Sequence, residues 1–195
     1  MPRTKMHELA ALGQSLWIDN ISRSMIASGK LKSLIEAGLR GQTSNPTIFK
    51  QAISTSSDYD QRILALTEAG KDAFAIYDDL TIKDVQDAAD LFRGVYEATK
   101  WLDGYVSLEI NPQMGNELEP QLKEGIRLWQ KLNRPNVCPN SETLRGSQSL
   151  RFGQPACPYV TKRNHSSAAL IPYDQSTSEV ATQWRFQIGQ RHSSQ

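Results

Sequence analysis

The sequence predicts an α/β fold in which short buried strands alternate with amphipathic helices in one parallel sheet or barrel. The first observation is a set of short apolar runs that end at polar side chains, such as Ser15–Asp19 and residues 105–110. The second is the helical spacing of apolar residues between these runs. The third is a corner at residues 41–49, where Pro46 suits the first turn of a helix that follows a strand. Since parallel strands need a crossover between them, right-handed strand–helix–strand units are expected.

Composition limits the classes of function. The chain has 195 residues with 38% hydrophobic content, which suffices for one domain, alone or with a disordered extension. A formal net charge of +1 gives no reason to expect nucleic acid or a membrane surface as partner. No apolar run approaches the roughly 20 residues that span a bilayer, and residues 1–12 lack the apolar centre of a signal peptide. We therefore expect a cytoplasmic protein, and Cys138 and Cys157 do not resemble a disulfide framework.

The chain up to the corner should form helix, strand, helix and strand. A short helix is expected within residues 1–13, followed by a strand at Ser15–Asp19. Apolar residues at helical spacing predict one helix over residues 22–37, which Gly29 weakens in its middle. Residues 39 and 40 should then end a buried strand that leads into the corner.

Three helices are expected between the corner and the next strand. The first follows Pro46, and the second opens at a pattern typical of a capping box over residues 57–60. The third opens at a similar pattern over residues 81–84. Its buried face is predicted by apolar residues that recur at i, i+3, i+4 and i+7: Val85, Ala88, Ala89, Phe92, Val95 and Tyr96.

The last part with regular patterns covers residues 105–137. A third strand is expected over residues 105–110, followed by a loop and then a helix that ends near Leu132. Val137 begins an expected fourth strand, which does not continue because Pro139 would interrupt a central ladder. The charged residues of the helix are expected to face water: Lys123, Glu124, Arg127 and Lys131.

Beyond Cys138 the sequence loses hydrophobic periodicity. We therefore divide the chain into a partial barrel over residues 1–137 and an irregular tail over residues 138–195, in which only short pieces such as residues 168–171 have some tendency to order. The cysteines and histidines of the tail are too widely spaced for a zinc site, and no metal is expected.

Five polar residues at the ends of the three strands are candidate site residues. Because the carboxyl ends of parallel strands meet at one edge of a sheet, Asp19, Thr43, Ser44, Asn45 and Glu109 should lie together there. Each also has a simpler interpretation. Asp19 suits a turn or a helix cap, Asn45 suits a helix cap, and Glu109 suits an ion pair with a neighbouring cation.

Several blocks of sequence, in order along the chain, resemble transaldolase, specifically the longer bacterial type found in actinobacteria and cyanobacteria. The resemblance covers about residues 9–137. The blocks are residues 12–19, 21–24, 41–49, 56–60, 88–91, 103–109, 128–129 and 133–136.

The resemblance implies the N-terminal part of a (β/α)₈ TIM barrel, with three to four βα units, in a cytoplasmic enzyme of the pentose phosphate pathway. Transaldolases move a dihydroxyacetone unit from sedoheptulose 7-phosphate to glyceraldehyde 3-phosphate, giving erythrose 4-phosphate and fructose 6-phosphate. They use a lysine Schiff base on the fourth strand and no cofactor. Sugar phosphates are the implied partners, and the full-length family allows a homo-oligomer.

The same resemblance implies roles for the candidate site residues. Asp19 resembles the carboxylate that handles the proton of the hydroxyl beside the breaking bond, and Glu109 the acid/base that works through a water. Asn45 matches the asparagine that holds the dihydroxyacetone unit, with Thr43 and Ser44 beside it in the substrate-binding corner. Two carboxylates in different surroundings can divide acid and base work between them.

The chain departs from the family where the reactive amine is expected. The Schiff-base lysine should stand near Asn140, but no lysine occurs between Lys131 and Lys162. Without an amine the imine cannot form, so this chain alone is expected to be inactive. We interpret the departure as a truncation, most simply a shifted reading frame beginning near Cys138. The alternatives are a non-catalytic half-barrel that binds a partner, and a related Schiff-base aldolase that acts on free dihydroxyacetone.

Overall fold

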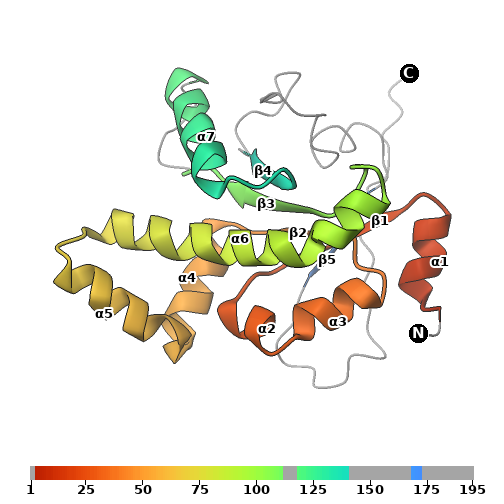
Figure 1. Ribbon diagram of the computed structural model, residues 1–195, viewed down its shortest axis with the longest axis horizontal. Helices are drawn as coiled ribbons and strands as arrows, with labels where there is room; N and C mark the ends of the chain where they lie inside the picture. Colours follow the sequence, from red (N-terminus) through yellow and green to blue (C-terminus); the bar gives the residue numbers. More distant parts are fainter. Residues whose placement is uncertain (1–2, 112–117, 141–167, 173–195) are drawn as a thin grey trace, which may run out of the picture.

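A parallel five-stranded sheet forms the centre of the molecule (Figure 1). The computed structural model describes residues 3–111, 118–140 and 168–172. The strand order is β4-β3-β2-β1-β5, and every pairing is parallel. The strands are β1 (Ser15–Asp19), β2 (Gly41–Thr43), β3 (Tyr105–Glu109), β4 (Val137–Asn140) and β5 (Ala168–Pro172).

The order of the first four strands is the order of a singly wound barrel. Each of these strands pairs with the strand that follows it along the chain. Right-handed crossovers in one direction place the connecting helices on one face of such a sheet. Figure 1 shows α3 and α6 lying across this face. The predicted α/β fold, a parallel sheet with helices that is consistent with part of a TIM barrel, is confirmed.

Seven α-helices and one short 3₁₀-helix, η1, are described around this sheet. The helices are α1 (Lys5–Ala11), α2 (Arg23–Ala27), α3 (Lys30–Glu36), α4 (Pro46–Thr55), η1 (Ser57–Tyr59), α5 (Asp60–Glu68), α6 (Ala73–Ala98) and α7 (Leu118–Leu132).

The helix expected over residues 22–37 is two helices. Gly29 adopts φ +78° and separates α2 from α3. A glycine reaches this left-handed conformation without steric cost, which is why the chain turns there rather than continuing as a weakened helix. The expectation of a single helix was therefore wrong.

The helix expected to open at residue 81 begins eight positions earlier in the chain, at Ala73. Asp72 caps it, since its Oδ1 accepts a hydrogen bond of 2.8 Å from the amide of Ala75. Thr81 lies buried in the middle of α6, where its hydroxyl donates to the carbonyl of Asp78. The capping-box pattern was misleading because a buried threonine can bond to the preceding turn of its own helix. The predicted buried face of this helix is confirmed.

The strand before the corner lies later than expected. β2 spans Gly41–Thr43, so it includes the first residues of the corner motif instead of ending at residue 40. The corner itself is as predicted, with Pro46 as the first residue of α4. The hydroxyl that caps the next turn belongs to Ser56, one residue before the expected pattern.

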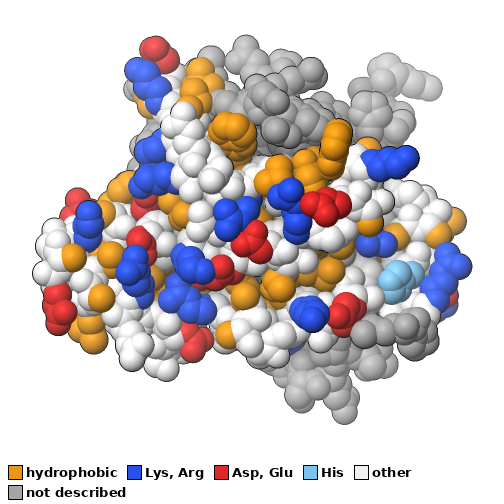
Figure 2. Space-filling view, in the orientation of Figure 1, with side chains coloured by type: hydrophobic (Ala, Val, Ile, Leu, Met, Phe, Trp, Pro, Cys, Tyr) orange, Lys and Arg blue, Asp and Glu red, His pale blue; other side chains and the backbone are white. Residues whose placement is uncertain are grey.

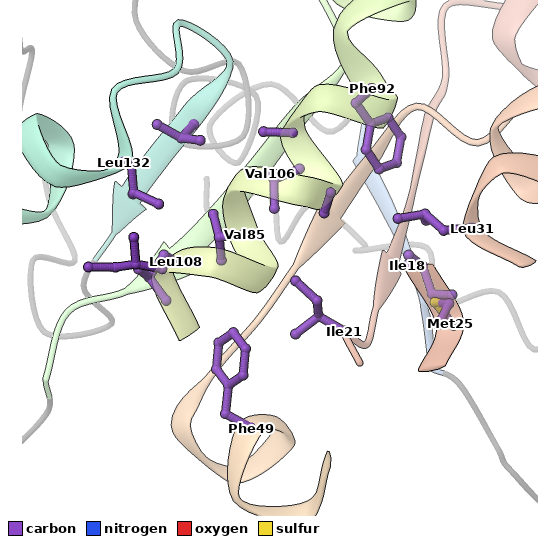
Figure 3. Close-up of a cluster of buried hydrophobic side chains, with 14 of the residues drawn as sticks. Ile18, Ile21, Met25, Leu31, Phe49, Val85, Phe92, Val106, Leu108 and Leu132 are labelled. Atoms are coloured by element: carbon purple, nitrogen blue, oxygen red, sulfur yellow. The ribbon is translucent and has the colours of Figure 1, made fainter. Parts of the chain in front are cut away.

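The main hydrophobic core lies between the sheet and the helices (Figure 3). From the strands it receives Ile18, Val106 and Leu108, and from α6 it receives Val85 and Phe92. Side chains alternate between the two faces of a strand. The residues between and beside these apolar positions, including Asp19 and Glu109, therefore face the other side of the sheet, the side that forms the interior of a barrel.

The charged residues of α7 were expected to face water, but several of them form ion pairs that involve buried carboxylates. Arg127 donates two hydrogen bonds of 2.8 Å to the carboxylate of Asp78 on α6, and it also bonds to Glu124. Lys131 approaches Asp78 to 2.7 Å. Both carboxylates are buried. A carboxylate on a distant part of the chain thus draws the cations of α7 inward, because its burial requires hydrogen-bonded partners.

A short fourth strand forms, contrary to the expectation that none would continue beyond Val137. β4 pairs with β3 from Val106↔Val137 to Glu109↔Asn140. Pro139 is tolerated because β4 is the outer strand of the described sheet, where one ladder donor can be missing.

Cys138 is disulfide-bonded, which the cysteine pattern did not suggest. Within the expected irregular tail, β5 is described beside β1, and residues 141–167 and 173–195 lie outside the described residues.

Candidate functional site

Three of the predicted site residues end adjacent strands at one edge of the sheet. Asp19 ends β1, Thr43 ends β2 and Glu109 ends β3. The register places Asp19 opposite Thr43. The sequence predicted that these strand ends meet, and the sheet order brings them together.

A hydrogen bond links the first two of these residues. The hydroxyl of Thr43 donates to Oδ1 of Asp19 over 2.6 Å, and it also lies 3.4 Å from the carbonyl of Ile18. The short distance is typical of a charge-assisted bond to a carboxylate. Because Oδ2 of Asp19 is not used in this bond, the carboxylate keeps an acceptor for another group.

Ser44 and Asn45 have structural tasks at the corner. The buried hydroxyl of Ser44 donates to the carbonyl of Ser107 over 2.7 Å, which ties the corner to β3. The Oδ1 of Asn45 accepts a bond of 2.9 Å from the amide of Ile48 and caps α4. Within the described part of the chain, the Nδ2 amide of Asn45 has no hydrogen-bond partner. The cap therefore occupies only the oxygen of this side chain.

The surroundings of Glu109 include a tyrosine that is not among the candidate site residues predicted from the sequence. Tyr77 lies on α6, and its ring packs edge-on against Phe49 of α4 with centroids 6.2 Å apart. Burial and the nearby charge of Glu109 together raise the pKa of Tyr77 to about 12. The sequence signal for this tyrosine is the helical spacing of Tyr77 with Thr81 and Val85, which a helix that starts at residue 81 does not include.

Ser107 adds a buried hydroxyl on the same face of the sheet. It lies two positions before Glu109 on β3, is fully buried, and its Oγ has no hydrogen-bond partner in the part of the chain that the structure describes. Such unpaired buried hydroxyls are uncommon in folded proteins. A residue inside an apolar-looking strand gives no sequence signal for this feature.

A groove of about 900 Å³ lies on the helical side of the molecule and does not form part of this edge. Its lining includes Arg23, Arg62, Lys83 and Lys131, each of which forms an ion pair with an aspartate. Figure 2 shows basic and acidic side chains intermingled across this face. The groove therefore presents no field of a single sign.

Two further features of the described residues bear on the class of site. They contain no cluster of histidine, cysteine and acidic side chains that suits a metal ion. Among the helices of the described ranges, none is long and apolar enough to cross a membrane.

Carboxylates, hydroxyls and an amide at the carboxyl ends of successive parallel strands define the class of the protein. It is an α/β protein of the barrel type, in which this edge is the usual place for small-molecule sites. A family model described as "Transaldolase/Fructose-6-phosphate aldolase" matches residues 16–138. The chain belongs to the transaldolase/fructose-6-phosphate aldolase family.

Curated relatives agree with this assignment. The chain is similar to a transaldolase of Trichodesmium erythraeum, with 47% identity over 131 residues, which is 67% of this chain and 34% of the relative. A "Transaldolase 2" of Nostoc sp. is 44% identical over the same shares. A transaldolase of Saccharopolyspora erythraea is 39% identical over 69% of this chain and 36% of the relative. The chain thus spans about a third of the length of these relatives.

Proposed function

We propose that this chain carries the substrate-orienting part of a transaldolase site that binds the dihydroxyacetone unit of a sugar phosphate. The observation that carries the proposal is the hydrogen-bonded pair of Asp19 and Thr43 at adjoining strand ends, with Glu109 on the next strand. The family relationship supports transaldolase chemistry of the pentose phosphate pathway, and we place the protein in the cytoplasm.

Each polar group has a part in this chemistry. The free amide of Asn45 donates to a hydroxyl or carbonyl oxygen of the dihydroxyacetone unit. The carboxylate of Asp19, oriented by Thr43, accepts the proton of the hydroxyl beside the carbon–carbon bond that breaks. Glu109 moves protons to and from the carbonyl oxygen through a water when an amine adds and water leaves. Two carboxylates on neighbouring strands thus serve different atoms of one substrate.

We further propose that the chain forms no imine by itself. No lysine lies between Lys131 and Lys162, the interval that contains β4. The ammonium of Lys131 lies 2.7 Å from Asp78 on the α6–α7 side, so it is held away from the strand ends. Lys162 lies outside the described residues. Without an amine, the electron sink for carbon–carbon cleavage is absent.

Two measurements test the chemical part of the proposal. The full chain is mixed with sedoheptulose 7-phosphate and glyceraldehyde 3-phosphate, and erythrose 4-phosphate is measured in a coupled assay. In parallel, fructose 6-phosphate and borohydride are added and the intact mass is recorded. We expect no turnover and no adduct. A mass increase that corresponds to a reduced dihydroxyacetone adduct would overturn the claim that the amine is missing.

Binding is tested separately from catalysis with two substitutions of one residue. In Asn45→Asp the side chain keeps a cap acceptor but loses the amide donor, whereas Asn45→Ser keeps a cap with a shorter hydroxyl. Fructose 6-phosphate is titrated into ¹⁵N-labelled protein, and amide shifts at the strand ends are followed. We expect both variants to fold, and Asn45→Asp to bind about tenfold more weakly because it lacks the amide hydrogen bond to the dihydroxyacetone unit. Equal binding by wild type and Asn45→Asp would contradict the proposal that the amide of Asn45 binds the substrate.

A second candidate function is a non-catalytic half-barrel that binds a partner. It is favoured by the sheet order, which leaves β4 as an outer strand of the described sheet. Outer strands present unpaired backbone groups that accept another strand. Analytical ultracentrifugation over a range of concentrations tests one form of this candidate, self-association through the outer strand, because a half-barrel that pairs with a second copy forms larger species and an isolated monomer does not.

A further inference from the structure

Arg23, Tyr59 and Asp84 form a closed hydrogen-bond network outside the strand ends. The guanidinium of Arg23 donates to Oδ1 of Asp84 from Nε at 3.0 Å and from Nη2 at 2.9 Å. The hydroxyl of Tyr59 donates to Oδ2 of the same carboxylate over 2.7 Å and accepts a bond of 3.0 Å from the amide of Arg23. The guanidinium also lies 4.4 Å from the centroid of the Tyr59 ring. The network joins α2, η1 and α6.

The network is buried and fully engaged. Tyr59 is 0% exposed and Asp84 is 1% exposed. Both carboxylate oxygens of Asp84 accept hydrogen bonds, and the tyrosine hydroxyl both donates and accepts. Burial raises the pKa of the Tyr59 hydroxyl far above its usual value, and the charge of Asp84 adds to this effect. A buried network in which each member has its partners restricts the backbone to one arrangement.

A single loop connects this network to the candidate site. Asp19 and Arg23 are separated only by Asn20, Ile21 and Ser22. The carbonyl of Asn20 accepts a bond of 2.5 Å from the side chain of Gln42 on β2. Ile21 is fully buried in the main core, where Figure 3 shows it between the sheet and the helices. The loop is therefore held by β2 at one end and by the network at the other.

We infer that Tyr59 and Asp84 are positioning residues for Asp19: they hold the β1–α2 loop so that the Asp19 carboxylate stays in contact with Thr43. The inference rests on the proposed function only in that Asp19 is the carboxylate that serves the substrate. The physical reason is the short connection. A displacement of Arg23 is transmitted through a buried isoleucine and a tethered carbonyl to the last residue of β1, and the 2.6 Å bond of Thr43 tolerates little movement.

A second charged network on α6 serves for comparison, because it joins two helices and, in the part of the chain that the structure describes, is not linked to the β1–α2 loop. Asp78, Arg127 and Glu124 join α6 to α7 and, within the described residues, form no hydrogen bond with the β1–α2 loop. Both networks contain a buried carboxylate and an arginine on a neighbouring helix. Only the network of Arg23 is continuous with the strand that ends in Asp19.

The test uses Tyr59→Phe in the full chain, with Tyr105→Phe as the matched control. Both substitutions remove one hydroxyl from a buried tyrosine ring. The hydroxyl of Tyr105 donates to the carbonyl of Trp101 over 2.8 Å, at the opposite end of the sheet. Three signals are recorded by NMR at one fixed pH: the carboxyl ¹³C resonance of Asp19, the side-chain resonances of Thr43, and the exchange rate of the Arg23 amide.

We expect Tyr59→Phe to move the Asp19 and Thr43 resonances and to speed exchange of the Arg23 amide about tenfold, the effect of one lost hydrogen bond in a charged network. Tyr105→Phe should reduce stability and leave these signals unchanged. Equal spectra of Asp19 and Thr43 in wild type and Tyr59→Phe would overturn the inference and leave the network a structural clamp.

A second variant guards against loss of folding. Arg23→Lys keeps the charge and the backbone bond to Tyr59 but loses the paired contacts to Asp84, at a side chain that is 25% exposed. The Asp19 and Thr43 resonances should move in the same direction as in Tyr59→Phe, and unchanged resonances would again refute the positioning role. These signals need no sugar phosphate, so a failure of the proposed substrate binding is distinguished from a failure of this inference.

Discussion

Gly41→Ala tests how closely β1 and β2 approach each other beneath the candidate site. Gly41 is the first residue of β2 and lies opposite Trp17 of β1. A Cβ atom at residue 41 would lie 2.4 Å from Cε2, 2.5 Å from Cδ2 and 2.8 Å from Cζ2 of the Trp17 indole. Real Cβ atoms do not come this close to other heavy atoms, so the ring or the strand must move.

The indole has little freedom to move. Trp17 is 1% exposed, its Nε1 donates to the hydroxyl of Ser15 over 2.9 Å, and it packs with Tyr96 and Tyr105. Inserting a methyl group into such a packed site costs about 1–3 kcal/mol. The reduced freedom of the unfolded chain returns about 0.4–1 kcal/mol. We expect a net loss of about 2 kcal/mol in the free energy of unfolding, because three ring atoms are contacted at once.

Gly94→Ala is the matched control because it makes the same chemical change in open space. Gly94 lies inside α6, and no heavy atom lies within 4 Å of its added Cβ. Alanine should therefore stabilise the helix by about 0.5–1 kcal/mol. Urea denaturation followed by circular dichroism gives both free energies. If Gly41→Ala is as stable as the wild type, the indole of Trp17 does not lie as close to Gly41 as described.

Three further substitutions have expected outcomes of defined sign. Lys100 holds φ +51° just after α6, so Lys100→Gly should raise the free energy of unfolding in urea by about 0.5–1 kcal/mol. Burial raises the pKa of Asp78, but the hydrogen bonds and charges of Arg127 and Lys131 outweigh this effect and hold the pKa below its ordinary value. Because the folded-state pKa is the lower one, this stability is present at neutral pH and is lost as the pH falls through the folded-state pKa. Asp78→Asn should therefore flatten the acid limb of a stability–pH curve. Ser44→Ala removes the bond to the carbonyl of Ser107 and should lower the free energy of unfolding by about 1 kcal/mol, which is measured as a lower melting temperature.

Each of these expectations has an opposing result. A destabilised Lys100→Gly variant would mean that the left-handed backbone after α6 carries no strain. An unchanged acid limb in Asp78→Asn would mean that the ion pairs with α7 do not persist in solution. A Ser44→Ala variant with the melting temperature of the wild type would mean that the corner does not depend on its bond to β3.

The ends of β1 and β3 and the corner after β2 were predictable because their signals are local. The apolar run before Asp19, the run before Glu109 and the Pro46 corner each lie within a few residues. A parallel sheet then brings such ends to one edge for any sequence of this pattern. The start of α6 was not predictable in the same way. Its first turns carry aspartates that resemble a solvated segment, and Asp78 is buried only because Arg127 reaches it from α7.

Local pattern alone thus specified where β1 and β3 end, which residue types follow them and where the family resemblance stops, but it placed the end of β2 too early and missed β4. The three-dimensional arrangement decided which of these residues touch. Thr43 bonds to Asp19 across 24 positions of chain, and Arg23 bonds to Asp84 across 61. Hydrophobic periodicity reports on neighbours within a turn or a strand. Register and buried ion pairs join distant segments, and their geometry is set only when the core between sheet and helices has packed.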